Sequence, residues 1–129
     1  MKIESGLLYS QNDEWVRVDG AVATIGITDY AQSQLSDIVY AEVMAEEGDL
    51  LEPGDLMGTV ESVKAAADIY CPVNGTVSEI NEAVVDDPAI INTDAFGEAW
   101  FIKVNLEGPL PSDLMDAEAY KKYCEGREH

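Results

Sequence analysis

Short runs of apolar and β-branched residues, which are typical of β-strands, recur along much of this chain and are separated by polar turn residues. The runs at residues 15–18 and 22–25 flank Asp19-Gly20, a dipeptide that favours a tight two-residue hairpin. Turns built from glycine, proline, aspartate and asparagine divide the later β-rich runs. We expect these later strands at residues 38–44, 56–63, 66–70, 76–80 and 100–104. Short strands with closely spaced turns predict a compact, mostly β sandwich or barrel.

Two segments have the pattern of helices instead. Thr28 can cap a short helix over residues 28–35, in which apolar residues recur at intervals of four. Ser112 follows two prolines and is expected to begin a C-terminal helix over about 112–124. Acidic residues in the first turn of that helix and lysines in its last turn complement the helix dipole. The acidic segment 81–97 is predicted to be a looser connection.

The length and composition favour one domain over residues 1–129. A chain of this length with 47% hydrophobic residues can bury a core without disulfide or metal staples. The first ten residues have no apolar run suited to a signal peptide or a membrane span, and they lack the arginine-rich character of a transit peptide. Cys71 and Cys124 lie far apart, in no metal-ligand spacing, and we expect reduced thiols. These features predict a cytoplasmic protein.

The charge balance restricts the partners. The chain has 26 acidic and 7 basic residues, which give a formal net charge of −19. Such a chain can neutralise almost no phosphates, so we exclude nucleic acid as a partner and expect no binding to an anionic membrane. The acidity can serve solubility, or it can steer the protein toward basic surfaces of partner proteins, and composition does not choose between these.

Side chains suited to catalysis are scarce. The only histidine is His129, close to a chain end, so neither a histidine base nor a multi-histidine metal site is expected. The sequence contains no glycine-rich phosphate loop and no recognisable nucleophile motif. Acidic pairs such as Glu46-Glu47 and Asp86-Asp87 are interpreted as solvated faces. We therefore predict neither a catalytic site nor a metal site.

The candidate chemistry lies in the segment Val60–Asp68. This segment joins two β-rich runs, and a hairpin over about residues 56–70 puts Lys64 at or near its tip, pointing into solvent. A lysine present only for solubility is the simplest alternative, but Lys64 is the only lysine between Lys2 and Lys103. An amine on a rigid turn is a suitable anchor for a covalent cofactor, because acylation removes its charge and leaves a long flexible stem.

Three segments resemble the family of glycine cleavage H proteins. The lipoyl-attachment motif of this family, in which the lysine of an ESVKA core is lipoylated, is similar to ESVKAAADIYCPVNGTV in this chain. The family's N-terminal signature is similar to DEWVRVDGAVATIGITDYAQSQLSDIV, and its closing helix to DLMDAEAYKKYCE. Biotin carriers also present a lysine on a hairpin but typically place methionine on both sides, where this chain has Val63 and Ala65. The resemblance covers nearly the whole chain.

The resemblance implies a fold, a cofactor and a set of partners. The fold is a barrel-sandwich hybrid of two small antiparallel sheets, as in lipoyl and biotinyl carriers. The cofactor is lipoic acid, bound covalently to Lys64 as N6-lipoyl-lysine on an arm that reaches roughly 14 Å. A glycine decarboxylase with pyridoxal phosphate loads an aminomethyl group, an aminomethyltransferase passes its carbon to tetrahydrofolate, and a dihydrolipoyl dehydrogenase with FAD reoxidises the dithiol. The protein itself would be a non-catalytic carrier that lipoate-attaching enzymes modify.

The resemblance also implies roles for three acidic residues. Glu61 stands three residues before Lys64 in the attachment motif, and we expect it to help lipoate-attaching enzymes recognise the turn. Glu14 and Asp68 are candidates to contact the arm, because a carboxylate can hold the protonated amine of an aminomethyl group and slow its hydrolysis. The alternative for each is an ordinary surface acid.

Three positions depart from the family pattern. The family commonly has Ser-x-x-His-Glu-Trp near its N-terminus, and this chain has Asp13 in the place of that histidine. Gln34 stands where some members carry another histidine. Both changes concern the docking of the arm rather than attachment at Lys64. Cys71 stands where serine or alanine is usual, and we expect it to be buried as a small apolar residue.

Two other functions stay open at this point. The chain could be a lipoyl carrier for lipoate relay or for sulfur metabolism, which the neighbouring genes would reveal. It could also be an unmodified acidic adaptor whose hairpin only binds a partner, which the intact mass of the protein would reveal.

Overall fold

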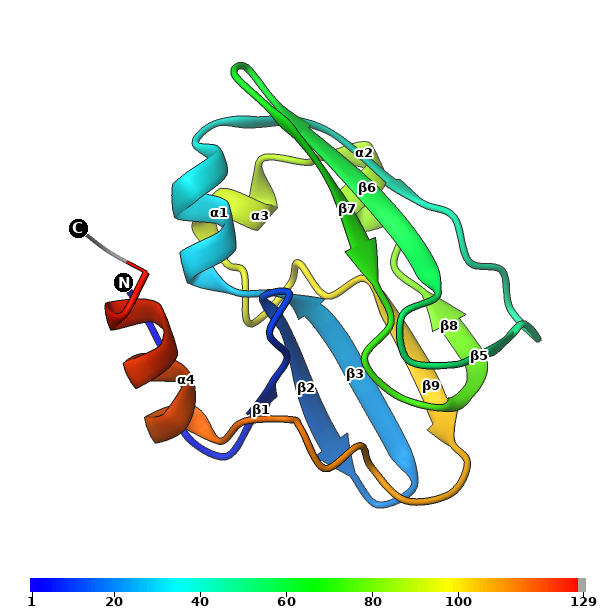
Figure 1. Cartoon of the computed structure of the whole chain (residues 1–129). Helices are drawn as coiled ribbons and strands as arrows, with labels where there is room; N and C mark the ends of the chain where they lie inside the picture. The colour runs from blue at the N-terminus through cyan, green and yellow to red at the C-terminus, as the bar shows by residue number, and fades with distance from the viewer. Residues whose placement is uncertain (128–129) are drawn as a thin grey trace.

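The expected strands form two antiparallel sheets in the computed structural model, which describes residues 1–127 (Figure 1). The strands are β1 (Leu8–Tyr9), β2 (Glu14–Asp19), β3 (Val22–Ile27), β4 (Ile38–Val43), β5 (Leu50–Leu51), β6 (Leu56–Ser62), β7 (Ala66–Tyr70), β8 (Gly75–Ile80) and β9 (Ile102–Leu106). The larger sheet has the order β1-β2-β3-β9-β8-β5 and the smaller sheet has the order β4-β6-β7. The helices are α1 (Asp29–Leu35), α2 (Ala83–Asp86), α3 (Ile90–Thr93) and α4 (Ala117–Glu125).

The predicted hairpin of β2 and β3 is part of the larger sheet, in which β3 also pairs with β9. Its pairing runs from Glu14 opposite Ile27 to Asp19 opposite Val22. Gly20 closes the turn with a φ of 63°, a conformation that a residue without a Cβ adopts at little cost. The hairpin leads directly into α1, whose N-terminus is capped by Thr28 as the sequence predicted.

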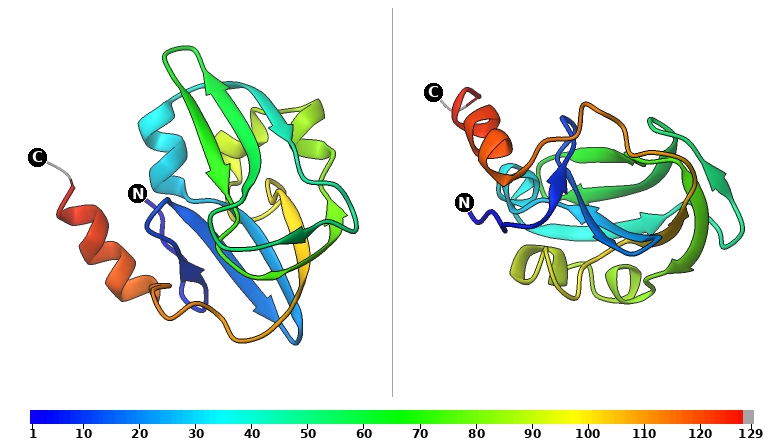
Figure 2. Two further views of the ribbon diagram at one scale, coloured as in Figure 1. Left: turned by 45° about the vertical axis from the view of Figure 1, so that its right-hand side comes forward. Right: turned by 90° about the horizontal axis from the view of Figure 1, so that it is seen from below.

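The sheets enclose the main hydrophobic core, and a second cluster lies under α4. The main core takes side chains from both sheets, including Ile25, Met57, Val60 and Ile102, all of which are fully buried. Cys71 belongs to this core and is only 1% exposed, which confirms its predicted burial. Figure 2 shows α4 packed to one side of the sheets, beside the strand β1.

The C-terminal helix begins later than expected, at Ala117 rather than Ser112. The side chain of Asp116 caps it by accepting a hydrogen bond from an N–H of the first turn. Met115, the residue before the cap, lies in a β-bridge, because Tyr9 and Met115 exchange two backbone hydrogen bonds of 2.7 Å. This bridge uses the backbone groups that an earlier helical turn would need, so the helix cannot begin at residue 112.

The segment 81–97 is more ordered than the sequence indicated, because it contains the two four-residue helices α2 and α3. Asn92 on α3 connects this segment to the small sheet. Its side chain accepts a hydrogen bond from the N–H of Ile38 at 2.9 Å and donates to the carbonyl oxygen of Ser36 at 2.9 Å. The segment therefore fixes the start of β4 relative to the end of α1. Within residues 1–127, no helix is long and apolar enough to cross a membrane.

Candidate functional site

Lys64 lies in the bend between β6 and β7, and its side chain is exposed. The two strands pair from Leu56 opposite Tyr70 to Glu61 opposite Ala66, which brings their ends together at the bend. Both figures show this hairpin projecting beyond the strands of the larger sheet, with the bend at its tip (Figures 1 and 2). The fold thus presents the amine of Lys64 at an extremity of the molecule.

Hydrogen bonds brace this bend from two sides. The hydroxyl of Ser62 accepts from the N–H groups of Lys64 at 3.3 Å and Ala65 at 3.0 Å, and the N–H of Ser62 donates to the carbonyl oxygen of Ala65 at 2.7 Å. From the residue just before β4, the carbonyl oxygen of Asp37 accepts the N–H of Val63 at 3.2 Å. These bonds hold the backbone at Lys64 and leave its side chain in solvent.

Glu61 lies two positions before the bend proper, on the outer face of the small sheet. It is exposed and stands directly opposite Tyr40 on β4. The hydrogen bond of Tyr40 to Glu42 and the nearby charge of Glu61 together raise the pKa of the tyrosine hydroxyl. Glu61 is therefore part of an acidic surface that adjoins the bend.

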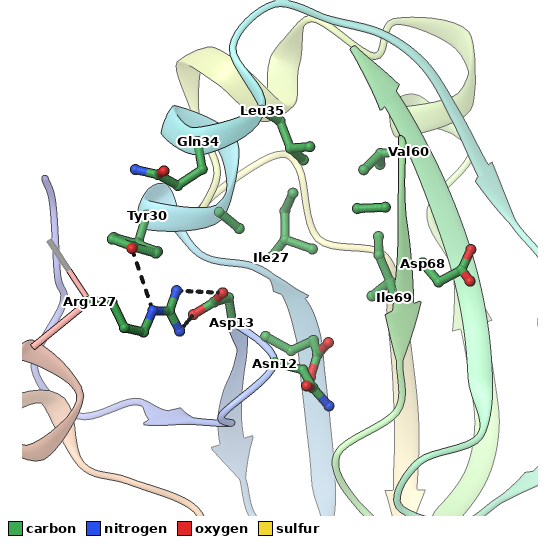
Figure 3. Close-up of a pocket in the computed structure, with 13 residues that line it drawn as sticks. Asn12, Asp13, Ile27, Tyr30, Gln34, Leu35, Val60, Asp68, Ile69 and Arg127 are labelled. Atoms are coloured by element: carbon green, nitrogen blue, oxygen red, sulfur yellow. Dashed lines mark hydrogen bonds and ion pairs between the residues drawn. The ribbon is translucent and has the colours of Figure 1, made fainter. Parts of the chain in front are cut away.

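A cavity of about 330 Å³ opens between α1, the start of β2 and the strand β7 (Figure 3). Its apolar walls come from α1 and from the inward faces of β3, β6 and β7, whereas polar side chains gather near the start of β2 and the end of α4. Glu14 and Asp68, which are far apart in the sequence, both border this cavity. The lining residues are Asn12, Asp13, Glu14, Ile27, Tyr30, Ala31, Gln34, Leu35, Val60, Ala67, Asp68, Ile69 and Arg127.

Glu14 is the buried acid of this cavity, since its side chain is only 2% exposed. Its carboxylate accepts hydrogen bonds from the hydroxyl of Ser10 and from the N–H of Tyr70, the latter at 3.4 Å. Burial nevertheless dominates and raises the pKa of Glu14 to about 7. Glu14 also borders a second cavity of about 270 Å³, together with Ser10 and Cys71. A positive charge brought into the first cavity would find a partner in this carboxylate.

Asp68 has a different position in the wall. It is exposed, and in Figure 3 its carboxylate points away from the apolar side chains of the cavity. The alternation of β7 explains this orientation, because its neighbours Ala67 and Ile69 face inward. The structure therefore brings Glu14 and Asp68 to one cavity but buries only the carboxylate of Glu14.

Asp13, which replaces the family histidine, forms an ion pair with Arg127 at the edge of the cavity (Figure 3). The guanidinium donates to the two carboxylate oxygens at 3.1 and 2.9 Å, and the hydroxyl of Tyr120 donates to the same carboxylate at 2.9 Å. Arg127 also lies over the rings of Tyr30 and Tyr123, at 4.3 and 4.6 Å from their centroids. Sequence reasoning missed Arg127, because it meets its partner only in the folded chain.

Replacing Arg127 by alanine is expected to lower the free energy of unfolding by about 1–2 kcal/mol, because it removes two charge-assisted hydrogen bonds and leaves the Asp13 carboxylate with less compensation. Urea denaturation monitored by tryptophan fluorescence measures this effect. The matched control is Lys122→Ala, an exposed cation on the preceding helix α4 for which we expect a change within about 0.5 kcal/mol. Equal losses in the two variants would show that the ion pair is not the cause.

Two antiparallel sheets, a lysine at the tip of a braced hairpin and an adjoining cavity define a carrier protein with the fold shared by lipoyl and biotinyl carriers. The family model "Glycine cleavage H-protein" matches residues 7–127, and the chain belongs to this family. It is a non-catalytic lipoyl carrier of the glycine cleavage system, which implies a decarboxylase and an aminomethyltransferase as its partners.

Individual relatives agree with this assignment. The glycine cleavage system H protein of Thermoanaerobacter sp. (strain X514) is 51% identical over 126 residues, which cover 97% of this chain and 98% of the relative. The H protein of Carboxydothermus hydrogenoformans is 45% identical, over 95% of each chain. A crystal structure of the H protein from Mycobacterium marinum matches with a TM-score of 0.82 and 31% identity, over 97% of this chain and 98% of that one. This match confirms the barrel-sandwich fold expected from the sequence.

Proposed function

We propose that Lys64 is the attachment site of the lipoyl group, with Glu61 as part of the signal that attaching enzymes read. The observation that carries this proposal is the exposed side chain of Lys64 on a bend. Hydrogen bonds from Ser62 and Asp37 hold the backbone of that bend in place.

In the attachment reaction, the neutral amine of Lys64 attacks the carboxyl carbon of an activated lipoate such as lipoyl adenylate. An amide bond forms at Nζ, AMP leaves, and the amine loses one proton.

The proposal extends to the enzymes that act on the finished arm. A decarboxylase with pyridoxal phosphate releases the carboxyl group of glycine as CO₂ and transfers the aminomethyl group to one sulfur of the oxidised arm, so that the other sulfur becomes a thiol. An aminomethyltransferase then passes the methylene carbon to tetrahydrofolate and releases ammonia. Dihydrolipoyl dehydrogenase, through FAD, passes two electrons from the dithiol to NAD⁺. The carrier contributes the anchor at Lys64 and a cavity that the strands of the same hairpin border.

The residues that line the cavity suit the chemistry of the loaded arm. Its apolar walls, which include Ile27, Leu35 and Ile69, suit the hydrocarbon part of the arm. Glu14 supplies a carboxylate for the protonated amine, and we propose that this charge-assisted hydrogen bond slows hydrolysis of the aminomethyl group. Asp68 borders the same cavity with its carboxylate turned outward, so we assign it a secondary role at the rim.

We place this carrier in the cytoplasm. Cys71 supports this placement, since it is a free thiol in the buried interior. Reduced thiols are the usual state of cysteine in that compartment.

Lipoylation of the purified protein tests the attachment site. We expect incubation with lipoate ligase, ATP and lipoate to raise the intact mass by one lipoyl group and fragmentation to locate the group on Lys64. The variant Lys64→Arg should keep its original mass, because a guanidinium does not form this amide. The matched control Lys121→Arg changes an exposed lysine on α4 and should be lipoylated like the wild type. A lipoyl group on Lys64→Arg would contradict the proposal by placing the attachment on another residue. No lipoyl group on the wild type would contradict it and favour an unmodified adaptor.

A further inference from the structure

A strip of apolar side chains lies on the surface next to the lysine bend. Val63 in the bend is 71% exposed, and Val39 and Tyr40 on β4 are 59% and 43% exposed. The three residues lie close together, because the N–H of Val63 bonds to the carbonyl oxygen of Asp37 and because Tyr40 pairs with Glu61 just before the bend. Clustered exposed apolar residues mark interaction surfaces more often than isolated ones do.

A β-bulge in β4 creates this strip. The register of β4 against β6 shifts between Ile38, which pairs with Ser62, and Tyr40, which pairs with Glu61, so Val39 is the extra residue. A bulge interrupts the alternation of inward and outward side chains, and here Val39 and Tyr40 are both exposed. The irregularity thus adds apolar surface at the edge of the bend.

Carboxylates border the strip on the same face of the small sheet. Glu61 stands across from Tyr40, and Glu42 accepts a hydrogen bond from the hydroxyl of Tyr40 at 3.0 Å. Asp37, which is exposed, precedes the strip on the chain. An apolar centre with a negative rim is complementary to an apolar patch that lysine or arginine residues surround.

We propose that Val39, Tyr40 and Val63 form the docking surface for the enzyme that acylates Lys64, and that this enzyme presents an apolar patch with a basic rim. The proposal rests on the proposed attachment at Lys64. An attaching enzyme must bring its active site to Nζ itself, so it has to cover the residues around the bend. Enzymes that act on the finished arm need to reach only the dithiolane, which extends roughly 14 Å away from the backbone and allows them to dock elsewhere.

Initial rates of lipoylation by a purified lipoate ligase with ATP and lipoate, followed by intact mass, test this assignment. The double variant Val39→Ser with Val63→Ser is expected to lower kcat/KM by about tenfold or more, as loss of central apolar contacts does at other interfaces, with kcat retained at saturating carrier. The matched control is Leu50→Ser on β5, which is 65% exposed and far from the bend (Figure 1). The variant Leu50→Ser should be lipoylated at the wild-type rate.

The acidic rim is tested separately by Glu42→Gln, which should weaken the dependence of kcat/KM on salt concentration.

The possible outcomes separate this proposal from the one it rests on. Equal kcat/KM for the wild type and the double variant would overturn the docking surface while leaving attachment at Lys64 intact. Normal lipoylation of the double variant combined with slower loading by the decarboxylase would also overturn it, because the strip would then belong to the decarboxylase. Absence of lipoylation in the wild type would overturn both proposals.

Discussion

A carrier with arginine in place of Lys64 is expected to reduce glycine cleavage in a reconstituted system to the rate measured without any carrier. Arginine keeps the positive charge and the exposed position at the bend, so the hairpin should fold as before. It does not accept the lipoyl group, however, and without the arm the partner enzymes share no intermediate. Release of ¹⁴CO₂ from glycine labelled in its carboxyl group, in the presence of the partner enzymes and lipoate ligase, measures the effect.

Two controls show that the loss comes from the missing arm. Lys121→Arg should support the wild-type rate, because Lys121 lies on α4, away from the hairpin. Circular dichroism and thermal unfolding of Lys64→Arg should match the wild type. Activity of Lys64→Arg above the carrier-free rate would show that another group takes over the role of Lys64.

We expect the wild type to lose stability relative to the variant Glu14→Gln as the pH rises. The quantity that falls is the free energy of unfolding of the wild type minus that of the variant. Burial raises the pKa of Glu14 from its ordinary value of 4.5 to about 7, so the folded protein holds a proton that the unfolded chain releases. The stabilising contribution is therefore fully present below pH 4.5 and is lost as the pH rises to about 7. The rise from 4.5 to about 7 corresponds to about 3 kcal/mol across that interval.

Urea denaturation of both proteins at pH 5 and pH 8 captures most of this change. The other acidic residues titrate in both proteins, so their contributions cancel when the two free energies of unfolding are subtracted. Glutamine suits this comparison because it is uncharged and has nearly the same shape as glutamate. Asp68→Asn is the matched control for removal of a carboxylate, since this exposed side chain borders the same cavity, and the effect of Glu14→Gln should exceed the effect of this control. A pH-independent difference for Glu14→Gln would mean that Glu14 ionises in the fold as readily as in the unfolded chain.

The local signals in the sequence predicted those elements whose stability is decided locally. The Asp19-Gly20 turn and the Thr28 cap are both present where expected. Errors occur where distant segments decide the conformation. The start of α4 is delayed by the bridge between Tyr9 and Met115, and β9 begins at residue 102 rather than 100. The two-residue strands β1 and β5 and the four-residue helices α2 and α3 are too short to show a period.

In the candidate site, too, residues of a local motif could be predicted from the sequence, whereas contacts between distant segments could not. Lys64 and Glu61 could be singled out because they belong to one short motif. Glu14 was named from its motif, but its burial depends on the packing of β2 against β7 and could not be derived from alternation. The ion pair of Asp13 with Arg127 joins residues 114 positions apart, and such a pair has no local signature.

Because the cavity adjoins the hairpin, a cargo on the tether can either rest in the cavity or reach a partner enzyme, and it cannot do both at once. A tether keeps the cargo at millimolar or higher effective concentration near every site within its radius, so storage competes continuously with delivery. If the cavity held the arm for about 99% of the time, each receiving enzyme would encounter it about a hundredfold less often. If Glu14 is the one buried acid that holds the cargo there, weak holding by that single contact would let the cargo leave for the next enzyme.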